Sequence, residues 1–280
     1  MRDAGLRLLI KREDLNHVTV SGNKWWKLKY NLQEAIQGKY DTVLTFGGAY
    51  SNHIYATAAA AHISNIKSIG IVRGELREPL NATLKFAKEH GMQIHYVSRS
   101  AYREKEVPTF LHELRKKFGN FFMIPEGGTN ALALQGCKEF GSLIDSIPAD
   151  YICMPIGTGG TMAGILKAIT GRKSVLGFSV LKGGAALEHT VRQLAGNTEV
   201  DWKVITEYSF GGYGKRNNRV TSFIESFRDQ TNIPLDFVYT GKMMSGIFDL
   251  IRKGFFAPGK TILAIHTGGL QGNSAADAHA

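Results

Sequence analysis

The sequence alternates short apolar segments, rich in β-branched residues, with longer segments of helical periodicity. Three of the apolar segments, residues 41–46, 151–156 and 260–266, run directly into glycine-rich loops. Strands that alternate with helices in this way form parallel sheets with helices packed on both faces. The alternation therefore predicts an α/β fold built on mostly parallel sheets.

Strands and helices are expected to alternate along the whole sequence. Strands are predicted at 7–10, 41–46, 68–72, 93–97, 121–124, 151–156, 174–180, 202–205 and 260–266. Helices are predicted at 26–37, 54–62, 80–89, 107–118, 131–147, 162–169, 185–194, 218–229 and 241–253. Residues 273–280 are expected to be irregular. No low-complexity linker interrupts the pattern, so we expect any two domains to be closely joined.

Length and composition narrow the class of protein. A chain of 280 residues has room for two modest domains or one large one. No apolar run approaches the roughly 18–20 residues that span a bilayer, and the first residues do not resemble a secretory signal. Cys137 and Cys153 lie in apolar segments without metal-ligand spacing. We therefore expect buried thiols in a cytoplasmic protein with no metal site and no membrane partner.

The chain is basic, with a formal net charge of +10. The basic residues are scattered, however, in small groups such as 115–117, 215–216 and 252–253, and no nucleic-acid-binding motif accompanies them. We expect no nucleic-acid partner, but a basic surface with one pocket for an anionic ligand. Nucleic-acid binding remains an alternative that rests on charge alone.

One glycine-rich loop has the composition of a phosphate-binding site. It consists of Gly157, Thr158, Gly159, Gly160 and Thr161, between a strand and a helix. Its backbone N–H groups and hydroxyls suit an anion. No Gly-Lys-Ser/Thr follows, which excludes a Walker loop, and the loop also lacks the dinucleotide fingerprint. The sequence favours a small phosphorylated ligand, with a glycine-rich turn that binds nothing as the alternative.

A second candidate feature is the lysine pair of residues 21–28. Lys24 follows Gly-Asn at the junction of a loop and a helix, and Lys27 lies about one helical turn further on. A partly desolvated lysine becomes nucleophilic, and a neighbouring cation lowers its pKa further. The alternative is a capped helix with surface lysines. Together with the phosphate loop and the Ser51-Asn52 loop, the pair suggests pyridoxal phosphate (PLP) carried on a lysine.

The ordered set of motifs is similar to one known enzyme family. The matching pieces are Lys11-Arg12-Glu13-Asp14, Gly22-Asn23-Lys24 with Lys27-Leu28, Gly47-Gly48 with Ser51-Asn52, Gly157–Thr161, Tyr239 with Gly241-Lys242, and His266 with Gly268-Gly269. In this order they resemble the 1-aminocyclopropane-1-carboxylate deaminase / D-cysteine desulfhydrase family of PLP enzymes.

The resemblance implies the architecture. It implies PLP fold type II, with two doubly wound domains and the cofactor in the cleft between them. Residues 1–27 and 126–280 would form the large domain, and residues 28–125 the small one. A homodimer is expected because enzymes of this fold are often dimers.

The resemblance also implies which residues hold the cofactor. Lys24 would carry PLP and then remove the Cα proton of the substrate. Asn52 would bond the ring hydroxyl, and Thr240, with Thr267 nearby, would face the ring nitrogen. Lys27 and the loop of Gly157, Thr158, Gly159, Gly160 and Thr161 would hold the phosphate.

The substrate, a small amino acid, would be bound from both sides of the cleft. Ser51 and Asn52 would receive its carboxylate, and Ser51 would alternatively shuttle a proton. His53 would contact the same carboxylate, or else simply begin a helix. Tyr213 and Tyr239 would face the substrate over the cofactor, with half-buried packing residues as the alternative.

Two departures from the deaminase pattern bear on the reaction. Thr240 stands where deaminases place glutamate, and Thr267 where they place leucine. A hydroxyl favours ring protonation less than a carboxylate does, so the electron sink is weaker and suits expulsion of a good leaving group. We therefore predict a PLP-dependent lyase that converts D-cysteine to pyruvate, ammonia and sulfide. The alternatives are the deaminase and a non-catalytic PLP-binding relative, which Trp26 favours because the family has arginine there.

Overall fold

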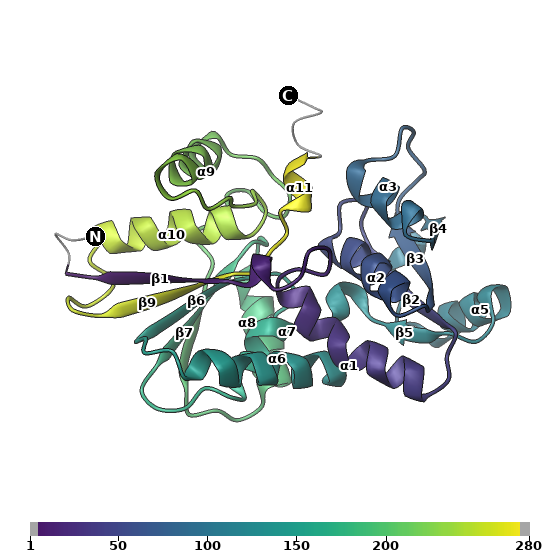
Figure 1. The fold of residues 1–280 in the computed structure, drawn as a ribbon, viewed down its shortest axis with the longest axis horizontal. Coiled ribbons are helices and arrows are strands. Elements are labelled where there is room, and N and C mark those ends of the chain that lie inside the picture. Colours follow the sequence, from purple (N-terminus) through teal and green to yellow (C-terminus); the bar gives the residue numbers. More distant parts are fainter. Residues whose placement is uncertain (1–4, 275–280) are drawn as a thin grey trace.

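The fold consists of two parallel sheets that form two lobes side by side (Figure 1). A computed structural model describes residues 5–274, and the expectation for residues 275–280 lies outside this range. The larger sheet has the strand order β1-β9-β6-β7-β8, and the smaller sheet has the order β4-β3-β2-β5. Every neighbouring pair of strands is parallel. The predicted α/β fold with two parallel sheets is confirmed.

The larger sheet carries helices on both faces. Its strands are β1 (Arg7–Arg12), β6 (Tyr151–Ile156), β7 (Ser174–Ser179), β8 (Asp201–Ile205) and β9 (Thr261–His266). Its helices are α6 (Ala131–Asp145), α7 (Gly160–Leu166), α8 (Gly184–Ala195), α9 (Asn218–Thr231) and α10 (Thr240–Arg252). Figure 1 shows α9 and α10 on one side of this sheet and α6, α7 and α8 on the other.

The smaller sheet contains the strands between the two halves of the larger lobe. They are β2 (Thr42–Gly47), β3 (Lys67–Arg73), β4 (Met92–Val97) and β5 (Phe122–Ile124). The helices of this lobe are α2 (Asn52–Ile63), α3 (Ala82–Glu89), α4 (Arg99–Arg103) and α5 (Pro108–Phe118). The sequence did not predict α4, because five residues are too few to establish a helical period.

Three further helices are short. Two are 3₁₀ turns, Glu13–Leu15 and Glu126–Gly128, and the third is α11 (Gln271–Ser274). Residues 273 and 274 were expected to be irregular but belong to α11, which packs beside α3 of the smaller lobe. No helix in the described residues is long and apolar enough to cross a membrane.

The burial of β6 explains why its sequence is almost continuously apolar. Ile152, Met154 and Ile156 point to the core under α6, α7 and α8, whereas Cys153 points to the core under α10. Successive side chains of a strand face opposite sides of the sheet, so a strand covered on both faces needs apolar residues at every position. This pattern places β6 at the centre of the larger lobe.

Helix α1 (Asn23–Gln37) joins the two lobes. Near its start, Trp26 stacks on Phe140 of α6 with 5.3 Å between ring centroids. From Leu28 onward its apolar side chains pack in the smaller lobe, where Leu28 and Leu32 share a core with Val43. This change of core within α1 supports the proposed domain boundary between residues 27 and 28, which stays a proposal.

The strand orders determine where loops can meet. In the larger sheet β6 has β7 on one side and β9 on the other, and in the smaller sheet β2 lies between β3 and β5. Ligands bind at the carboxyl ends of strands where the winding direction reverses. The loops that follow β2, β5, β6 and β9 all begin at such ends, and these loops form the site described below.

Candidate active site

A cavity of about 860 Å³ lies where these four loops meet. This volume is toward the upper end of the range usual for small-molecule sites. Most of the predicted site residues line it, namely Lys24, Lys27, Ser51, Asn52, His53, Gly157, Thr158, Gly159, Thr161, Tyr213, Tyr239 and Thr267. Gly160 and Thr240 do not line it.

The position of Lys24 depends on a close approach between two loops. Gly22 has a φ of +72°, and a Cβ at this position would lie 1.9 Å from the carbonyl oxygen of Thr267. Only glycine allows this approach, which starts α1 at Asn23 rather than at the expected Trp26. The Asn23 amide then donates to the Thr161 hydroxyl over 2.8 Å. Lys24 therefore lies in the first turn of a helix and not in a loop.

The amines of the two lysines converge on one acceptor. The carbonyl oxygen of Gly127 accepts from Lys24 Nζ at 3.3 Å and from Lys27 Nζ at 2.7 Å. Burial, and then the charge of Lys27, lower the pKa of Lys24 well below its ordinary value. Burial lowers the pKa of Lys27 to about 8. Lys24 is thus the amine of this pair that more readily becomes neutral and nucleophilic.

Lys27 also reaches the phosphate loop predicted from the sequence. Its amine donates to the hydroxyls of Thr129 at 2.9 Å and Thr158 at 3.4 Å, and these two hydroxyls lie 2.7 Å apart. Gly159, with a φ of +77°, turns the chain into α7 directly after Thr158. A cation, two hydroxyls and a tight glycine loop at one end of the cavity fit the phosphate of PLP, and the desolvated amine of Lys24 fits its aldehyde.

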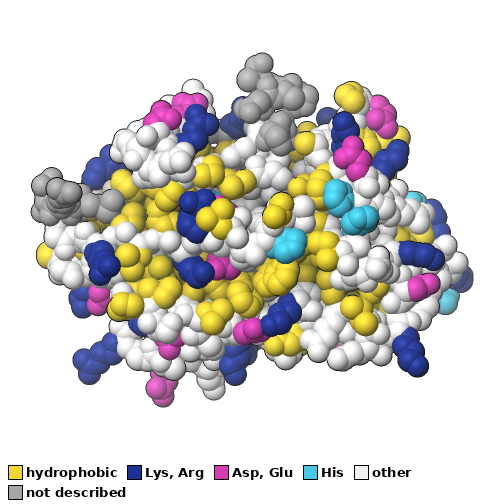
Figure 2. Space-filling model, in the orientation of Figure 1, with side chains coloured by type: hydrophobic (Ala, Val, Ile, Leu, Met, Phe, Trp, Pro, Cys, Tyr) yellow, Lys and Arg dark blue, Asp and Glu magenta, His cyan; other side chains and the backbone are white. Residues whose placement is uncertain are grey.

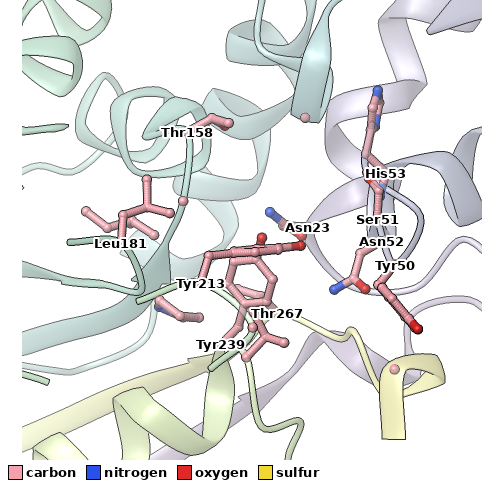
Figure 3. Close-up of a pocket in the computed structure, with 18 of the residues that line it drawn as sticks. Asn23, Tyr50, Ser51, Asn52, His53, Thr158, Leu181, Tyr213, Tyr239 and Thr267 are labelled. Atoms are coloured by element: carbon pink, nitrogen blue, oxygen red, sulfur yellow. The ribbon is translucent and has the colours of Figure 1, made fainter. Parts of the chain in front are cut away.

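Ser51 and Asn52 begin α2 at the opposite wall of the cavity. The Ser51 hydroxyl caps α2 by accepting from the backbone N–H groups of His53 and Ile54 at 3.2 and 3.3 Å. Its own proton remains available to a ligand. The Asn52 Oδ1 accepts from Gln271 Nε2 at 2.6 Å, and Figure 3 shows its nitrogen turned toward Thr267 and Tyr213. Gln271 was not predicted, because nothing in its surroundings in the sequence relates it to Asn52.

His53 is buried and anchored to the smaller sheet. Its Nε2 lies 2.8 Å from the hydroxyl of Thr45, which donates its own proton to the Ile124 carbonyl at 2.8 Å. The hydroxyl must therefore accept from Nε2–H, which leaves Nδ1 as the acceptor nitrogen. Burial, with Lys24 and Lys27 nearby, lowers the pKa of His53 well below its ordinary value. The structure thus holds a neutral imidazole of one tautomer beside the cavity.

The two predicted tyrosines stand together on the wall of the larger lobe. Tyr213 and Tyr239 meet edge to face with 5.9 Å between ring centroids. Both project into the cavity opposite Ser51 and Asn52 (Figure 3). Burial raises the pKa of both phenols, that of Tyr239 well above its ordinary value. Both therefore keep their protons at neutral pH and act as hydrogen-bond donors.

Thr240 and Thr267, the two departures from the deaminase pattern, differ in their position relative to the cavity. Thr267 lines the cavity. Thr240 is fully buried, and its hydroxyl donates to the Asp236 carboxylate at 2.7 Å. That carboxylate also accepts the backbone N–H groups of residues 238, 239 and 240, at the start of α10. The predicted contact of Thr240 with a cofactor ring stays a prediction, because the structure engages its hydroxyl with Asp236.

Three charged side chains of the cavity wall were not predicted. They are Arg73, Glu126 and Arg216. In the sequence each is one charge among many, without a motif that separates it from solvated surface residues. Only the convergence of the two lobes brings them to one cavity.

The comparisons with known proteins agree with this geometry. The family described as pyridoxal-phosphate dependent enzyme matches residues 2–268. The chain is 32% identical, over 97% of its length and 87% of the relative's, to a protein of Pyrococcus abyssi named putative 1-aminocyclopropane-1-carboxylate deaminase. It is 32% identical, over 96% of its length and 73% of the relative's, to the bifunctional D-cysteine desulfhydrase/1-aminocyclopropane-1-carboxylate deaminase of Arabidopsis thaliana.

Two further similarities point the same way. The chain is 27% identical to the D-cysteine desulfhydrase of Salmonella typhi, over 95% of this chain and 87% of that one. A crystal structure described as an ACC deaminase homologue superposes with a TM-score of 0.83 at 30% identity, covering 99% of this chain and 89% of that chain. The chain therefore belongs to the pyridoxal-phosphate dependent enzymes, in the group that contains the 1-aminocyclopropane-1-carboxylate deaminases and the D-cysteine desulfhydrases.

Proposed function

We propose that this PLP-dependent lyase eliminates the β-substituent of a small D-amino acid, with D-cysteine giving pyruvate, ammonia and sulfide. The observation that carries the proposal is the lysine pair. Lys24 and Lys27 share the Gly127 carbonyl in one cavity, and the pKa of Lys24 is depressed. Such an amine is a nucleophile and, once released, a base.

Lys27 and the loop after β6 would hold the cofactor. The Lys27 amine and the hydroxyls of Thr129 and Thr158 already lie within hydrogen-bond distance of one another. When bound, PLP would supply an electron sink that eases removal of the Cα proton. A bound phosphate would also favour the charged form of Lys27, which keeps that amine a cation while Lys24 becomes neutral.

Ser51 and the start of α2 would bind the substrate carboxylate. The Ser51 hydroxyl accepts two N–H groups of α2 and has its proton free to donate. Asn52 would present its amide N–H to the cofactor ring, oriented by Gln271. These contacts would direct the Cα proton toward Lys24, because a substrate held at both its carboxylate and its amine has little rotational freedom.

Tyr213 and Tyr239 would assist the leaving group. Lys24 would take the Cα proton, and the Cβ–S bond would break with its electron pair leaving on sulfur. Because both phenols are protonated at neutral pH, either one would be able to donate a hydrogen bond or a proton to that sulfur. Water would then release pyruvate and ammonia, which balances the overall hydrolysis of D-cysteine.

The second candidate is 1-aminocyclopropane-1-carboxylate deamination, which would yield 2-oxobutanoate and ammonia. It is favoured by the higher identity to relatives that carry this name, 32% against 27% for the desulfhydrase of Salmonella typhi. Against it stand Thr267 at the cavity wall and Thr240, which supplies no carboxylate. Replacing Thr267, which lines the cavity, with Leu should raise the deaminase activity under this candidate.

The primary experiment is an absorbance spectrum of the purified protein with a parallel pyruvate assay. We expect a band of enzyme-bound PLP near about 410–430 nm that changes on addition of D-cysteine while pyruvate forms. A band that changes with 1-aminocyclopropane-1-carboxylate and yields 2-oxobutanoate would support the second candidate instead. A band that neither compound alters would refute both substrate assignments, and it is also the result expected of a non-catalytic PLP-binding relative.

The assembly, the compartment and the partners of the enzyme are also proposals. We place the enzyme as a homodimer in the cytoplasm, where the buried free thiols Cys137 and Cys153 would stay reduced. Sedimentation at several protein concentrations tests the dimer. On the face shown in Figure 2, Lys and Arg are interspersed with acidic and apolar side chains rather than gathered in one patch. This distribution supports a small-molecule substrate over nucleic acid.

A further inference from the structure

One buried cation of the larger lobe has no part in the proposed function. Lys242 belongs to the motif of Tyr239 with Gly241-Lys242, and it lies in the first turn of α10. Its side chain is only 1% exposed and does not line the cavity. Burying an ammonium group costs free energy unless hydrogen bonds or an opposite charge compensate it. The burial of this lysine therefore calls for specific partners.

The partners of Lys242 are two carbonyl groups of one loop. Lys242 Nζ donates to the carbonyl oxygen of Ser209 at 2.8 Å and to that of Gly212 at 2.7 Å. Burial lowers the pKa of Lys242, and the charge of Asp236 opposes that shift. Hydrogen bonds from an ammonium group are shorter and stronger than bonds between neutral groups. The amine therefore ties the start of α10 to the loop of residues 209–214.

This loop is rich in glycine. Three of its glycines have a positive φ, between +66° and +106°, and glycine loses more conformational freedom on folding than any other residue. The Gly212 N–H donates to the Ser209 carbonyl at 3.0 Å, and the Lys215 N–H donates to the Gly212 carbonyl at 3.3 Å. The two carbonyls that close these turns are the same two that Lys242 holds.

Tyr213 follows Gly212 directly, so the position of the Gly212 carbonyl sets where the phenol stands. The ring of Tyr213 meets that of Tyr239 edge to face, and both project into the cavity (Figure 3). The Tyr213 side chain is 44% exposed, so packing restrains it less than it restrains a core residue. The placement of this phenol therefore depends on the backbone of its loop, which Lys242 holds.

A buried charge of the opposite sign holds the other phenol. The Asp236 carboxylate accepts the backbone N–H of Val238 at 2.9 Å and that of Tyr239 at 2.8 Å. An anion thus holds the N–H groups beside Tyr239, and a cation holds the carbonyl groups beside Tyr213. Asp236 lies just before α10 and Lys242 within its first turn, so one segment of the chain positions both phenols.

We infer that Lys242 is a positioning residue for the reaction, because its ammonium group fixes the loop of residues 209–214 and thereby holds Tyr213 beside Tyr239. The inference deepens the proposed function and rests on it for the role of the two phenols. It assigns Lys242 no contact with substrate or cofactor. Lys242→Met keeps a long buried side chain but donates nothing, and both carbonyls still accept a backbone N–H. This variant should therefore keep the fold and loosen the loop.

Hydrogen exchange tests the hold of Lys242 on the loop without any turnover. Exchange of backbone amides in the PLP-loaded protein is followed by mass spectrometry. In Lys242→Met the amides of Gly212 and Lys215 should exchange at least about tenfold faster than in the wild type, because hydrogen bonds from a charged donor are lost. The amides of β6 should keep their wild-type rates. Lys242→Gln, which keeps a neutral donor, should give a smaller acceleration and remains informative if Lys242→Met does not fold.

The matched control is Lys167→Met. The amine of Lys167 also donates to a backbone carbonyl, that of Ala195, at 2.8 Å. Neither of these residues lines the cavity. Lys167→Met should therefore leave exchange in the loop of residues 209–214 unchanged.

A double-mutant cycle on D-cysteine turnover tests the link to Tyr213. Lys242→Met alone should lower kcat by at least about tenfold, since a misplaced proton donor loses much of its effect on rate. In the background of Tyr213→Phe the same change should lower kcat by less than about threefold, because the phenol that Lys242 positions is already absent. A purely structural role of Lys242 would give the same factor in both backgrounds.

Two results would overturn the inference. One is wild-type exchange of the Gly212 and Lys215 amides in both Lys242→Met and Lys242→Gln. The other is an equal loss of turnover with and without the Tyr213 hydroxyl. Faster loop exchange in a protein that does not degrade D-cysteine would refute the substrate assignment and support the hold of Lys242 on the Tyr213 loop.

Discussion

Lys24 and Lys27 donate to the same carbonyl oxygen, that of Gly127, over 3.3 and 2.7 Å. This carbonyl and the hydroxyls of Thr129 and Thr158 are neutral acceptors, which do not fully compensate two neighbouring ammonium groups, so the pair resists carrying two charges. The pKa of both amines is lowered, that of Lys27 to about 8. This relationship makes Lys24 reactive and prepares Lys27 for an anion, and it motivates the first two predictions.

Replacing Lys24 with alanine should abolish lyase activity and preserve the fold. A general base typically contributes about 10²–10⁴-fold to rate, and Lys24 would also hold the cofactor, so the loss of kcat should reach at least about 10³-fold. The measurements are pyruvate release and the thermal midpoint. Lys88→Ala, an exposed lysine of α3, is the matched control. Equal turnover in Lys24→Ala and Lys88→Ala would remove Lys24 from the mechanism.

The stability of the cofactor-free protein should depend on pH through Lys27. The folded pKa is about 8 and the ordinary value is 10.5. Between these values the unfolded chain binds more protons than the folded one, so stability rises with pH across this window. Below pH 8 both states are protonated and the burial cost is present in full. Above about 10.5 both states are neutral and the cost is gone.

Comparison with Lys27→Met isolates this contribution. From about pH 7.5 to about pH 9.5 the wild-type protein should gain about 2 kcal/mol relative to the variant. Urea unfolding at each pH measures the difference. Added PLP should flatten the wild-type profile, because its phosphate favours the charged amine. A difference that does not change with pH would mean that Lys27 titrates normally in the fold.

Replacing Gly22 with alanine should strongly destabilise the protein. The new Cβ would lie 1.9 Å from the Thr267 carbonyl oxygen, so the loops before α1 and after β9 must separate. Gly171→Ala is the matched control, because Gly171 has a similar φ of +74° but open space around it. Both variants place a side chain at a positive φ, which costs about 1 kcal/mol or more. Gly22→Ala should cost at least about 2 kcal/mol more by urea unfolding, and equal costs would contradict the close approach.

Replacing Trp26 with phenylalanine should leave a buried carboxylate short of one donor. The indole N–H of Trp26 donates to Glu13 at 2.7 Å, and Glu13 is only 2% exposed. Phenylalanine preserves an aromatic ring for stacking on Phe140 but cannot donate. We expect a loss of about 1–3 kcal/mol in the free energy of unfolding.

A double-mutant cycle provides the control for this pair. In the background of Glu13→Gln the carboxylate charge is absent, so the same Trp26→Phe change should cost clearly less. If Trp26→Phe lowers the free energy of unfolding equally in both backgrounds, Trp26 contributes to stability through the packing of its ring and not through its hydrogen bond to Glu13. The backbone of Glu13 also accepts the Gly22 N–H at 2.8 Å, which ties this pair to the loop before Lys24.

The fold class was predictable from local patterns because the apolar periodicity of a segment indicates the secondary structure of that same segment. Alternating strands and helices predicted mostly parallel sheets with helices on both faces, and residues 151–156 were predicted as one of the strands. The division into two domains came from the resemblance to a known family. The start of α1 was predicted three residues late, since the signal is a contact between Gly22 and Thr267, which are far apart in the sequence. Five-residue α4 escaped prediction because it is shorter than two helical turns.

The candidate site likewise has residues that the sequence predicted and residues that it did not. Its glycine loops, Lys24, Ser51 and the tyrosines have recognisable neighbours in the sequence, and the structure gathers them around one cavity. Arg73, Arg216 and Gln271 have no such neighbours. They reach the site because the two lobes face each other across α1, and α11 returns to α3.

The sequence by itself determined the fold class and the type of chemistry, because periodicity and short motifs act within one element or one loop. The tertiary structure decided which groups share the cavity and which are turned away from it. The Thr240 hydroxyl donates to the Asp236 carboxylate and accepts from the Asp236 backbone N–H, and Thr240 does not line the cavity. Arg73, by contrast, lines the cavity from the other lobe. Such outcomes depend on how the two sheets pack together. No local pattern in the sequence encodes how far apart two residues of different sheets lie.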